Sequence, residues 1–205
     1  MLLLKVCGMK EEQNLSDLIK VQPDFIGLIF HEKSPRNITK HTSTSIPKEI
    51  GTVGVFVNET EGFVLDKISE FDLKYIQLHG TESPHFCKNI KRLNRKVIKA
   101  FNIHPEFDFS QLDDYTPYCD YFLFDAFGKN AGGNGITFDW KLLDKYIGET
   151  PFLLSGGINS SMSESLKGIS HPMYKGVDIN SKFEISPGLK DIEKIKLFKQ
   201  KLDQR

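Results

Sequence analysis

Two side chains that can exchange protons stand at the ends of otherwise apolar segments. Cys7 ends the run LLLKVC, and Asp125 is the carboxyl group in YFLFDA. A carboxyl group in an apolar strand is costly unless it has a partner or a chemical role. An acid and a base on opposite sides of a bound molecule suit proton transfer. The other two cysteines, Cys87 and Cys119, occupy a helical apolar face and a loop, so we interpret them as inert buried thiols.

The segments that must position these residues form a regular series. Eight short apolar runs begin at positions 2, 24, 51, 75, 97, 121, 151 and 174, so neighbouring runs start 22 to 30 residues apart. One strand and one short helix fill that length, which predicts a single (β/α)₈ barrel over residues 1–205. Prolines in TKHTSTSIPKEI and HPEFDFSQLDDYTPY predict that the second and fifth helices are short or missing. The alternative, an open doubly wound sheet, usually has fewer strands.

Helical patterns fill most of the gaps between the runs. SPHFCKNIKRL predicts a helix with Ser83 as its N-cap and Pro84 in its first position. DWKLLDKYIG predicts a helix that ends near Gly148. Its apolar face is expected to contain Leu142, Leu143, Tyr146 and Ile147.

The expected strand ends carry polar residues or glycine, whereas the strand interiors are apolar. In this fold the active site lies at the carboxyl ends of the strands, so we predict a site there. Its candidate residues are Cys7, Arg36, Asn58, His79, Asp125, Ser155, Gly156, Gly157, Asp178, Asn180 and Ser181.

Glycine-rich loops near the end of the chain predict a phosphate site. SGGI follows the seventh run and precedes NSSMSESL, which we predict to start a helix, and DINSK follows the eighth run. Loops after strands seven and eight are the usual phosphate site of such barrels, and a helix N-terminus favours an anion. A third loop, FGKNAGGNG, follows the sixth run.

Lys5 lies two residues before Cys7, so both side chains point to the same face of the first strand. A buried ammonium group needs an opposite charge. Asp178 on the neighbouring eighth strand is the expected partner. Such a cation would favour the thiolate form of Cys7. Alternatively, Lys5 only fills a polar layer of the barrel floor.

Composition narrows the class of protein. The 205 residues contain 27 Lys and Arg and 27 Asp and Glu, so no overall charge attracts nucleic acid or an anionic membrane. The three widely spaced cysteines form no metal-binding pattern and indicate a reducing compartment. No apolar run is long enough for a signal peptide or a membrane span. We expect a soluble, cytoplasmic protein.

The motifs KVCGMK, DFIGLIF with SPR, VGVFVN, IQLHGTE, FDAFGKNAGGNGITFDW, LLSGGI and GVDINSKFE with PGLKD occur in this order. Together they resemble the phosphoribosylanthranilate isomerase family of tryptophan biosynthesis over nearly the whole chain. The resemblance implies an Amadori rearrangement of N-(5′-phosphoribosyl)anthranilate, without cofactor or metal. It implies that Asp125 is the general acid and Cys7 the general base.

The resemblance also implies how the substrate is bound. Arg36 of SPR would bind the anthranilate carboxylate, for which a guanidinium fork is well shaped. Gly156, Gly157, Asn180 and Ser181 would hold the phosphate, and Gln77 and His79 would line the site. We count Asp178 with the substrate-binding residues. The only expected partner is the phosphosugar, and the chain is expected to be a monomer or a homodimer.

Three positions depart from the family pattern. Asn134 stands where threonine is common, Asn180 where serine is common, and Lys182 where glycine is common. They concern phosphate contacts and not the acid–base pair. Two alternatives remain. One is the related isomerase of histidine biosynthesis, which uses two aspartates in place of this cysteine and aspartate. The other is a phosphosugar-binding barrel without catalysis.

Overall fold

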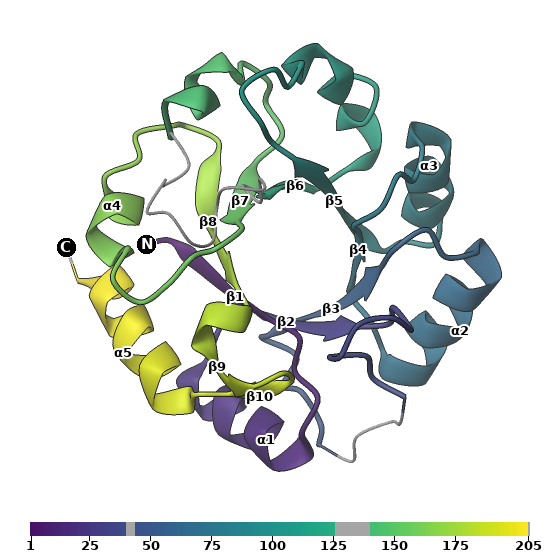
Figure 1. The fold of residues 1–205 in the computed structure, drawn as a ribbon. Coiled ribbons are helices and arrows are strands. Elements are labelled where there is room, and N and C mark those ends of the chain that lie inside the picture. Colours follow the sequence, from purple (N-terminus) through teal and green to yellow (C-terminus); the bar gives the residue numbers. More distant parts are fainter. Residues whose placement is uncertain (40–43, 126–139, 205) are drawn as a thin grey trace.

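Eight parallel strands close into a barrel in the computed structural model of the chain, which describes residues 1–39, 44–125 and 140–204 (Figure 1). The strands follow each other round the barrel in chain order, and β1 pairs with both β2 and β8. The predicted barrel is therefore confirmed. Its strands are β1 (Leu3–Cys7), β2 (Phe25–Ile29), β3 (Gly51–Phe56), β4 (Tyr75–Leu78), β5 (Lys96–Asn102), β6 (Tyr121–Asp125), β7 (Phe152–Ser155) and β8 (Tyr174–Ile179).

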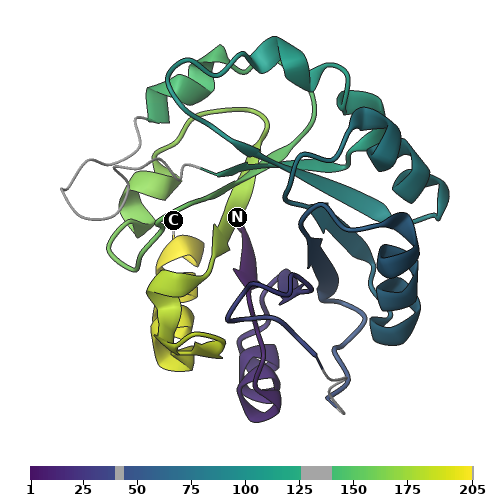
Figure 2. The same ribbon diagram turned by 45° about the vertical axis from the view of Figure 1, so that its right-hand side comes forward.

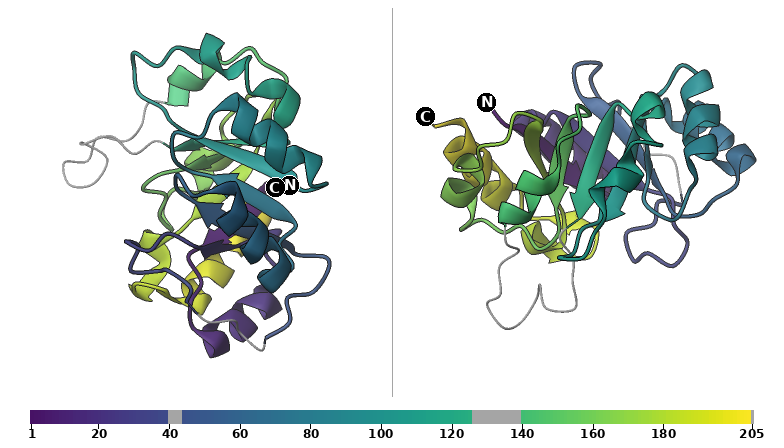
Figure 3. Two further views of the ribbon diagram at one scale, coloured as in Figure 1. Left: turned by 90° about the vertical axis from the view of Figure 1, so that its right-hand side faces the viewer. Right: turned by 90° about the horizontal axis from the view of Figure 1, so that it is seen from above.

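α-Helices surround the barrel, as Figures 2 and 3 show from further directions. The cap of α3 is the one expected, because the Ser83 side chain accepts a hydrogen bond from the Phe86 amide and Pro84 begins the helix. Thr60 and Asp191 cap α2 and α5 in the same way. The helices are α1 (Glu12–Val21), α2 (Glu61–Phe71), α3 (Pro84–Arg92), α4 (Ser163–Lys167) and α5 (Ile192–Asp203).

The shell of helices is incomplete in the two places expected. Between β2 and β3, the residues that the structure describes form no helix. Between β5 and β6 lie only two short 3₁₀ helices, η1 (Phe109–Leu112) and η2 (Thr116–Tyr118). Pro105 and Pro117 interrupt this connection, because proline lacks the N–H that a helix interior requires.

The helix predicted over DWKLLDKYIG is instead the 3₁₀ helix η3 (Trp140–Lys145), and Asp139 lies outside the described residues. Leu143 and Tyr146 are buried as expected, but Ile147 is 94% exposed. A 3₁₀ helix has about three residues per turn. Leu143 and Tyr146 therefore share a face, and Ile147 points away from it. The Tyr146 hydroxyl donates a hydrogen bond to the Thr150 carbonyl, and this bond fixes the chain that follows η3.

Aromatic rings cover the barrel where α-helices are missing. Phe124 stacks on Phe152 with ring centroids 4.6 Å apart, and Phe101 meets Phe122 edge to face at 5.3 Å. Phe109 of η1 and Tyr146 both contact Phe124. Large aromatic side chains bury much apolar area per residue, so short 3₁₀ turns suffice to close this side of the outer core.

A small antiparallel hairpin follows β8 and was not predicted. It consists of the 3₁₀ turn η4 (Ser181–Phe183), β9 (Glu184–Ser186) and β10 (Leu189–Lys190). The Asn14 side chain on α1 holds it by donating to the Lys190 carbonyl and accepting from the Lys190 amide. The hairpin therefore lies beside α1, as Figure 1 shows.

None of the helices within the described ranges is both long and apolar enough to cross a membrane.

Candidate active site

A cavity of about 410 Å³ lies at the carboxyl ends of the barrel strands. Ten of the thirteen residues that the sequence singles out line it, and they come from β1, β4, β6, β7 and β8 or from the loops after these strands. These ten are Cys7, Gln77, His79, Asp125, Ser155, Gly156, Gly157, Asp178, Asn180 and Ser181. Ile29, Val55 and Ile158 supply an apolar part of the wall. The other three, Lys5, Arg36 and Asn58, are not among the described residues that line the cavity.

Lys5 and Asp178 form an ion pair directly beneath Cys7. The Lys5 Nζ lies 2.8 Å from Asp178 Oδ2, and the two side chains are 0% and 7% exposed. The backbone explains the contact, because Lys5 and Asp178 are register partners in the paired strands β1 and β8. The predicted partnership is therefore correct. Burial lowers the pKa of Lys5, but the charges of Asp178 and Cys7 outweigh burial, so its pKa is raised.

Lys5 favours the thiolate form of Cys7, as expected, but its effect does not outweigh burial. Cys7 is 4% exposed, and burial raises the pKa of its thiol. Lys5 opposes this effect, whereas the Asp178 carboxylate adds to it, and the pKa remains raised. Asp178 neutralises the cation that would otherwise stabilise a thiolate. Cys7 is thus held as a neutral thiol until something else lowers its pKa.

Gln77, His79 and Asp125 form a chain of hydrogen bonds along the cavity wall. Gln77 Nε2 lies 2.7 Å from His79 Nδ1, and His79 Nε2 lies 3.3 Å from Asp125 Oδ2. With the Gln77 amide donating to Nδ1, the imidazole proton is on Nε2 and is donated to Asp125. The histidine thereby fixes the direction of the Asp125 carboxyl group.

The predicted phosphate loops follow β7 and β8, and the loop after β7 lies next to Asp125, which is the register partner of Ser155. Gly156 and Gly157 have φ angles of 90° and 66°, a region that favours glycine. A helix does start within NSSMSESL, but α4 begins only at Ser163 and has five residues. The Asn159 side chain accepts hydrogen bonds from the Ser161 amide and hydroxyl. Such an asparagine turn competes with helix formation. The loop FGKNAGGNG, with Asn134, lies outside the described residues.

Arg36 is bound to a carboxylate of the protein itself. Its Nε and Nη2 atoms lie 2.8 and 2.5 Å from the two oxygens of Glu184. Lys190 is buried and lies 2.7 Å from Glu184 Oε1, and it donates to Asn180 Oδ1 as well. The sequence analysis did not identify Glu184 or Lys190. The turn residues SPG between two short apolar segments were the available signal for a hairpin.

Three buried polar atoms at the cavity have no hydrogen-bond partner among the described residues. They are Gln77 Oε1, Ser155 Oγ and Asp178 Oδ1. A buried polar atom without a partner costs about 1–3 kcal/mol. Because all three residues line the same cavity, the site is suited to a ligand that carries hydroxyl groups. Ser155 was noted at its strand end but was not predicted to bind substrate.

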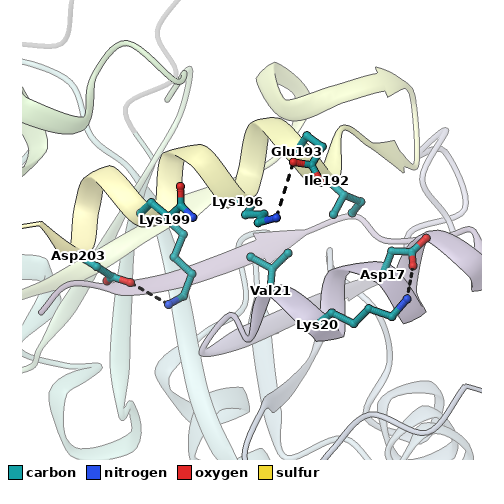
Figure 4. Close-up of a pocket in the computed structure, with 9 residues that line it drawn as sticks. Asp17, Lys20, Val21, Ile192, Glu193, Lys196, Lys199 and Asp203 are labelled. Carbon is teal, nitrogen blue, oxygen red and sulfur yellow. Dashed lines mark hydrogen bonds and ion pairs between the residues drawn. The ribbon is translucent and has the colours of Figure 1, made fainter.

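A second hollow of about 510 Å³ lies outside the barrel, between α1 and α5 (Figure 4). Its charged side chains pair within their own helices. Asp17 binds Lys20 on α1, and Lys199 binds Asp203 on α5. Because these charges already compensate one another at the surface, the hollow offers no comparable set of reactive groups.

Comparison with known proteins decides the family. The family model for N-(5′-phosphoribosyl)anthranilate isomerase matches residues 4–201.

The chain belongs to the phosphoribosylanthranilate isomerase family.

Curated members of the phosphoribosylanthranilate isomerase family are similar over their whole length. The enzyme of Parabacteroides distasonis is 44% identical, with 98% of this chain and 93% of the relative covered. The enzyme of Phocaeicola vulgatus is 40% identical, with 100% and 99% covered. The match therefore extends over the barrel and the hairpin.

Solved phosphoribosylanthranilate isomerases have the same fold. The enzyme of Thermotoga maritima superposes with a TM-score of 0.82 at 31% identity and covers 98% of both chains. A family member crystallised with reduced 1-(o-carboxyphenylamino)-1-deoxyribulose 5-phosphate has a TM-score of 0.82 at 30% identity, again with 98% of both chains covered.

Proposed function

We propose that this chain converts N-(5′-phosphoribosyl)anthranilate to 1-(2-carboxyphenylamino)-1-deoxyribulose 5-phosphate, a step of tryptophan biosynthesis. The observation that carries the proposal is the cavity of a family barrel that both Cys7 and Asp125 line. The relative crystallised with the reduced product analogue supports a phosphosugar ligand.

The reaction needs an acid and then a base, and these are the roles proposed for Asp125 and Cys7. Asp125 protonates the furanose ring oxygen, the C1–O bond breaks, and the nitrogen lone pair forms a protonated Schiff base. The Cys7 thiolate then removes the proton from C2, the C2–H electron pair forms a C1–C2 double bond, and the C=N π pair returns to nitrogen to give an enolamine. The enolamine tautomerises to the ketone.

Cys7 must give its own proton to solvent before it can act as the base, and the charge of the intermediate favours this loss. Burial raises the pKa of Cys7 in the free protein, but a Schiff-base cation formed beside it favours the thiolate. The Asp178 carboxylate neutralises Lys5 at 2.8 Å, so the intermediate supplies the cation that matters. Proton removal is thereby coupled to ring opening.

The rest of the cavity is proposed to bind the two ends and the hydroxyl groups of the substrate. Gly156, Gly157, Asn180 and Ser181 would hold the phosphate, and Lys182, which lines the cavity, would add a cation. Gln77 and Asp178 offer buried acceptors to sugar hydroxyls. His79 would orient Asp125, and Arg36 would bind the anthranilate carboxylate.

Further properties remain part of the proposal. We place the whole activity in one domain over residues 1–205 of a cytoplasmic protein. A monomer or a homodimer is proposed, since the Thermotoga maritima relative is described as dimeric and was also crystallised as engineered monomers.

The test is the loss of substrate fluorescence when freshly generated N-(5′-phosphoribosyl)anthranilate meets the purified protein. Decay faster than spontaneous hydrolysis is expected for the wild type, and Cys7→Ala or Asp125→Asn should abolish it. Cys87→Ala is the matched control, because it removes an equally buried thiol that does not line the cavity. No decay with the wild type would refute the proposal and direct the assay to the histidine-pathway substrate.

A further inference from the structure

Glu184 is a buried carboxylate that organises one side of the cavity rim. Its oxygens accept hydrogen bonds from Arg36 Nε and Nη2, from Lys190 Nζ and from the Gly188 amide. The Glu184 side chain is 4% exposed, compared with 18% for Arg36 and 0% for Lys190. These donors lower the pKa of Glu184 to about 2, against the effect of burial. Glu184 is therefore ionised at every pH at which the protein is used.

The contact with Arg36 uses one particular edge of the guanidinium group. Nε and Nη2 form the side edge, and both hydrogen bonds to Glu184 lie there, at 2.8 and 2.5 Å. The end edge consists of Nη1 and the second hydrogen of Nη2. Nη1 has no hydrogen-bond partner among the described residues. A planar guanidinium fixed by two bonds cannot rotate, so the direction of its end edge is set by Glu184.

The Arg36 side chain passes close to the reacting end of the cavity. A Cβ atom added at Gly8 would lie 2.7 Å from Arg36 Cδ and 2.9 Å from Asn180 Oδ1. The Arg36 side chain therefore passes over the residue that follows Cys7. Lys190 connects the same cluster to the other binding end, because it donates to both Glu184 and Asn180.

We propose that Glu184 is a positioning residue that sets the preference for a substrate with a carboxylated aryl group. It holds Arg36 by the side edge and presents the end edge to the substrate carboxylate. The inference rests on the proposed function, in which Arg36 binds that carboxylate. A purely structural role, in which the pair only ties the hairpin to the loop after β2, predicts equal effects on all ligands. If Glu184 instead weakens the attraction of Arg36 for the substrate carboxylate by neutralising its charge, a screening role, loss of Glu184 should tighten carboxylate binding.

The test compares two stable ligands by calorimetry. One is reduced 1-(o-carboxyphenylamino)-1-deoxyribulose 5-phosphate, and the other is the same molecule without its carboxyl group. The ratio of the two dissociation constants measures carboxylate recognition. For the wild type we expect a ratio of about 10- to 100-fold, as for hydrogen bonds to charged groups. Glu184→Gln should reduce the ratio to within about twofold of that of Arg36→Ala, with little change for the ligand without the carboxyl group.

Two further variants keep the test decisive. Glu82→Gln is the matched control, because Glu82 is also a buried carboxylate, 2% exposed and paired with Lys99, but is not in contact with Arg36. It should leave the ratio unchanged. Glu184→Gln leaves two cations without their carboxylate, so the double variant Glu184→Gln with Lys190→Met is measured if the single variant does not fold.

The outcomes separate this inference from the proposed function. If Arg36→Ala lowers the ratio and both Glu184 variants do not, Glu184 has no positioning role. A ratio that rises in Glu184→Gln would assign screening instead. If the wild type binds both ligands equally, Arg36 does not recognise the carboxylate, and the positioning role of Glu184 is then wrong as well. A wild type that binds neither ligand and isomerises no substrate overturns the proposed function itself.

Discussion

Replacement of Lys5 by methionine tests the energetics of the barrel interior. Methionine fills nearly the same volume but removes the ammonium group, which leaves the buried Asp178 carboxylate without its cation. Breaking a buried ion pair by removing one partner costs about 3–5 kcal/mol. For a chain of this length each kcal/mol lowers Tm by about 2–4 °C. The expected loss of Tm is therefore roughly 6–20 °C.

Burial, and not distance, gives this magnitude. Lys20 and Asp17 on α1 lie 2.7 Å apart, nearly the same as the 2.8 Å between Lys5 and Asp178. Their side chains are 74% and 38% exposed, against 0% and 7% in the barrel. Water already solvates the exposed pair, so Lys20→Met should cost less than about 1 kcal/mol. Lys20→Met is therefore the control for Lys5→Met.

The measurement is equilibrium unfolding in urea, followed by circular dichroism and by the fluorescence of Trp140. Coincident transitions would justify a two-state free energy. The double variant Lys5→Met with Asp178→Asn removes both charges, so it should be more stable than Lys5→Met alone. The reasoning is refuted if Lys5→Met costs less than about 1 kcal/mol, or if the double variant is no more stable than the single one.

Four other outcomes are expected. Because burial raises the pKa of Cys7, the thiolate that acts as base is abundant only above the ordinary pH range of a thiol. The value of kcat/KM should therefore still rise through that range, and a profile that is flat from about pH 7 to 9 would contradict this. Folding lowers the pKa of Glu184 from 4.5 to about 2, which contributes about 3 kcal/mol to the free energy of unfolding above pH 4.5. This contribution is lost as the pH falls to about 2, so acid unfolding of Glu184→Gln should lack this part of the pH dependence. Ser155→Ala removes a buried hydroxyl that has no hydrogen-bond partner among the described residues, so Tm should not fall, while the affinity for the product analogue should drop by about 2- to 10-fold in calorimetry. Gly8 has φ 79° and no room for a Cβ beside Arg36, so Gly8→Ala should cost about 1–3 kcal/mol in urea unfolding; an unchanged midpoint would show that the loop adapts.

Features that depend on chain periodicity could be predicted from the sequence. The spacing of the apolar runs predicts the barrel, and the polar residues at the ends of most runs predict the cavity lining, with Arg36 and Asn58 as exceptions. The pairing of Lys5 with Asp178 follows from the strand period of two and from the closure of β1 against β8. These rules need no knowledge of distant side chains.

Features that depend on competing local forces or distant contacts could not be predicted. The residue at which α4 starts, Ser163, depends on the turn that Asn159 forms ahead of it. Arg36 and Glu184 are 148 positions apart in the chain, and no local pattern links them. The charge state of Cys7 depends on burial, Lys5 and Asp178 together, and residue types alone do not show which effect is largest.

The pairing of the first strand with the last has a consequence during synthesis. Lys5 emerges from the ribosome 173 residues before Asp178, which at about 5–20 residues per second is a delay of about 10 to 35 s. Throughout that time β1 has an unpaired edge that other chains could join. A charge that points inward from an edge strand discourages such pairing. We therefore expect the lysine that pairs with Asp178 also to discourage aggregation of the nascent chain until its partner is synthesised.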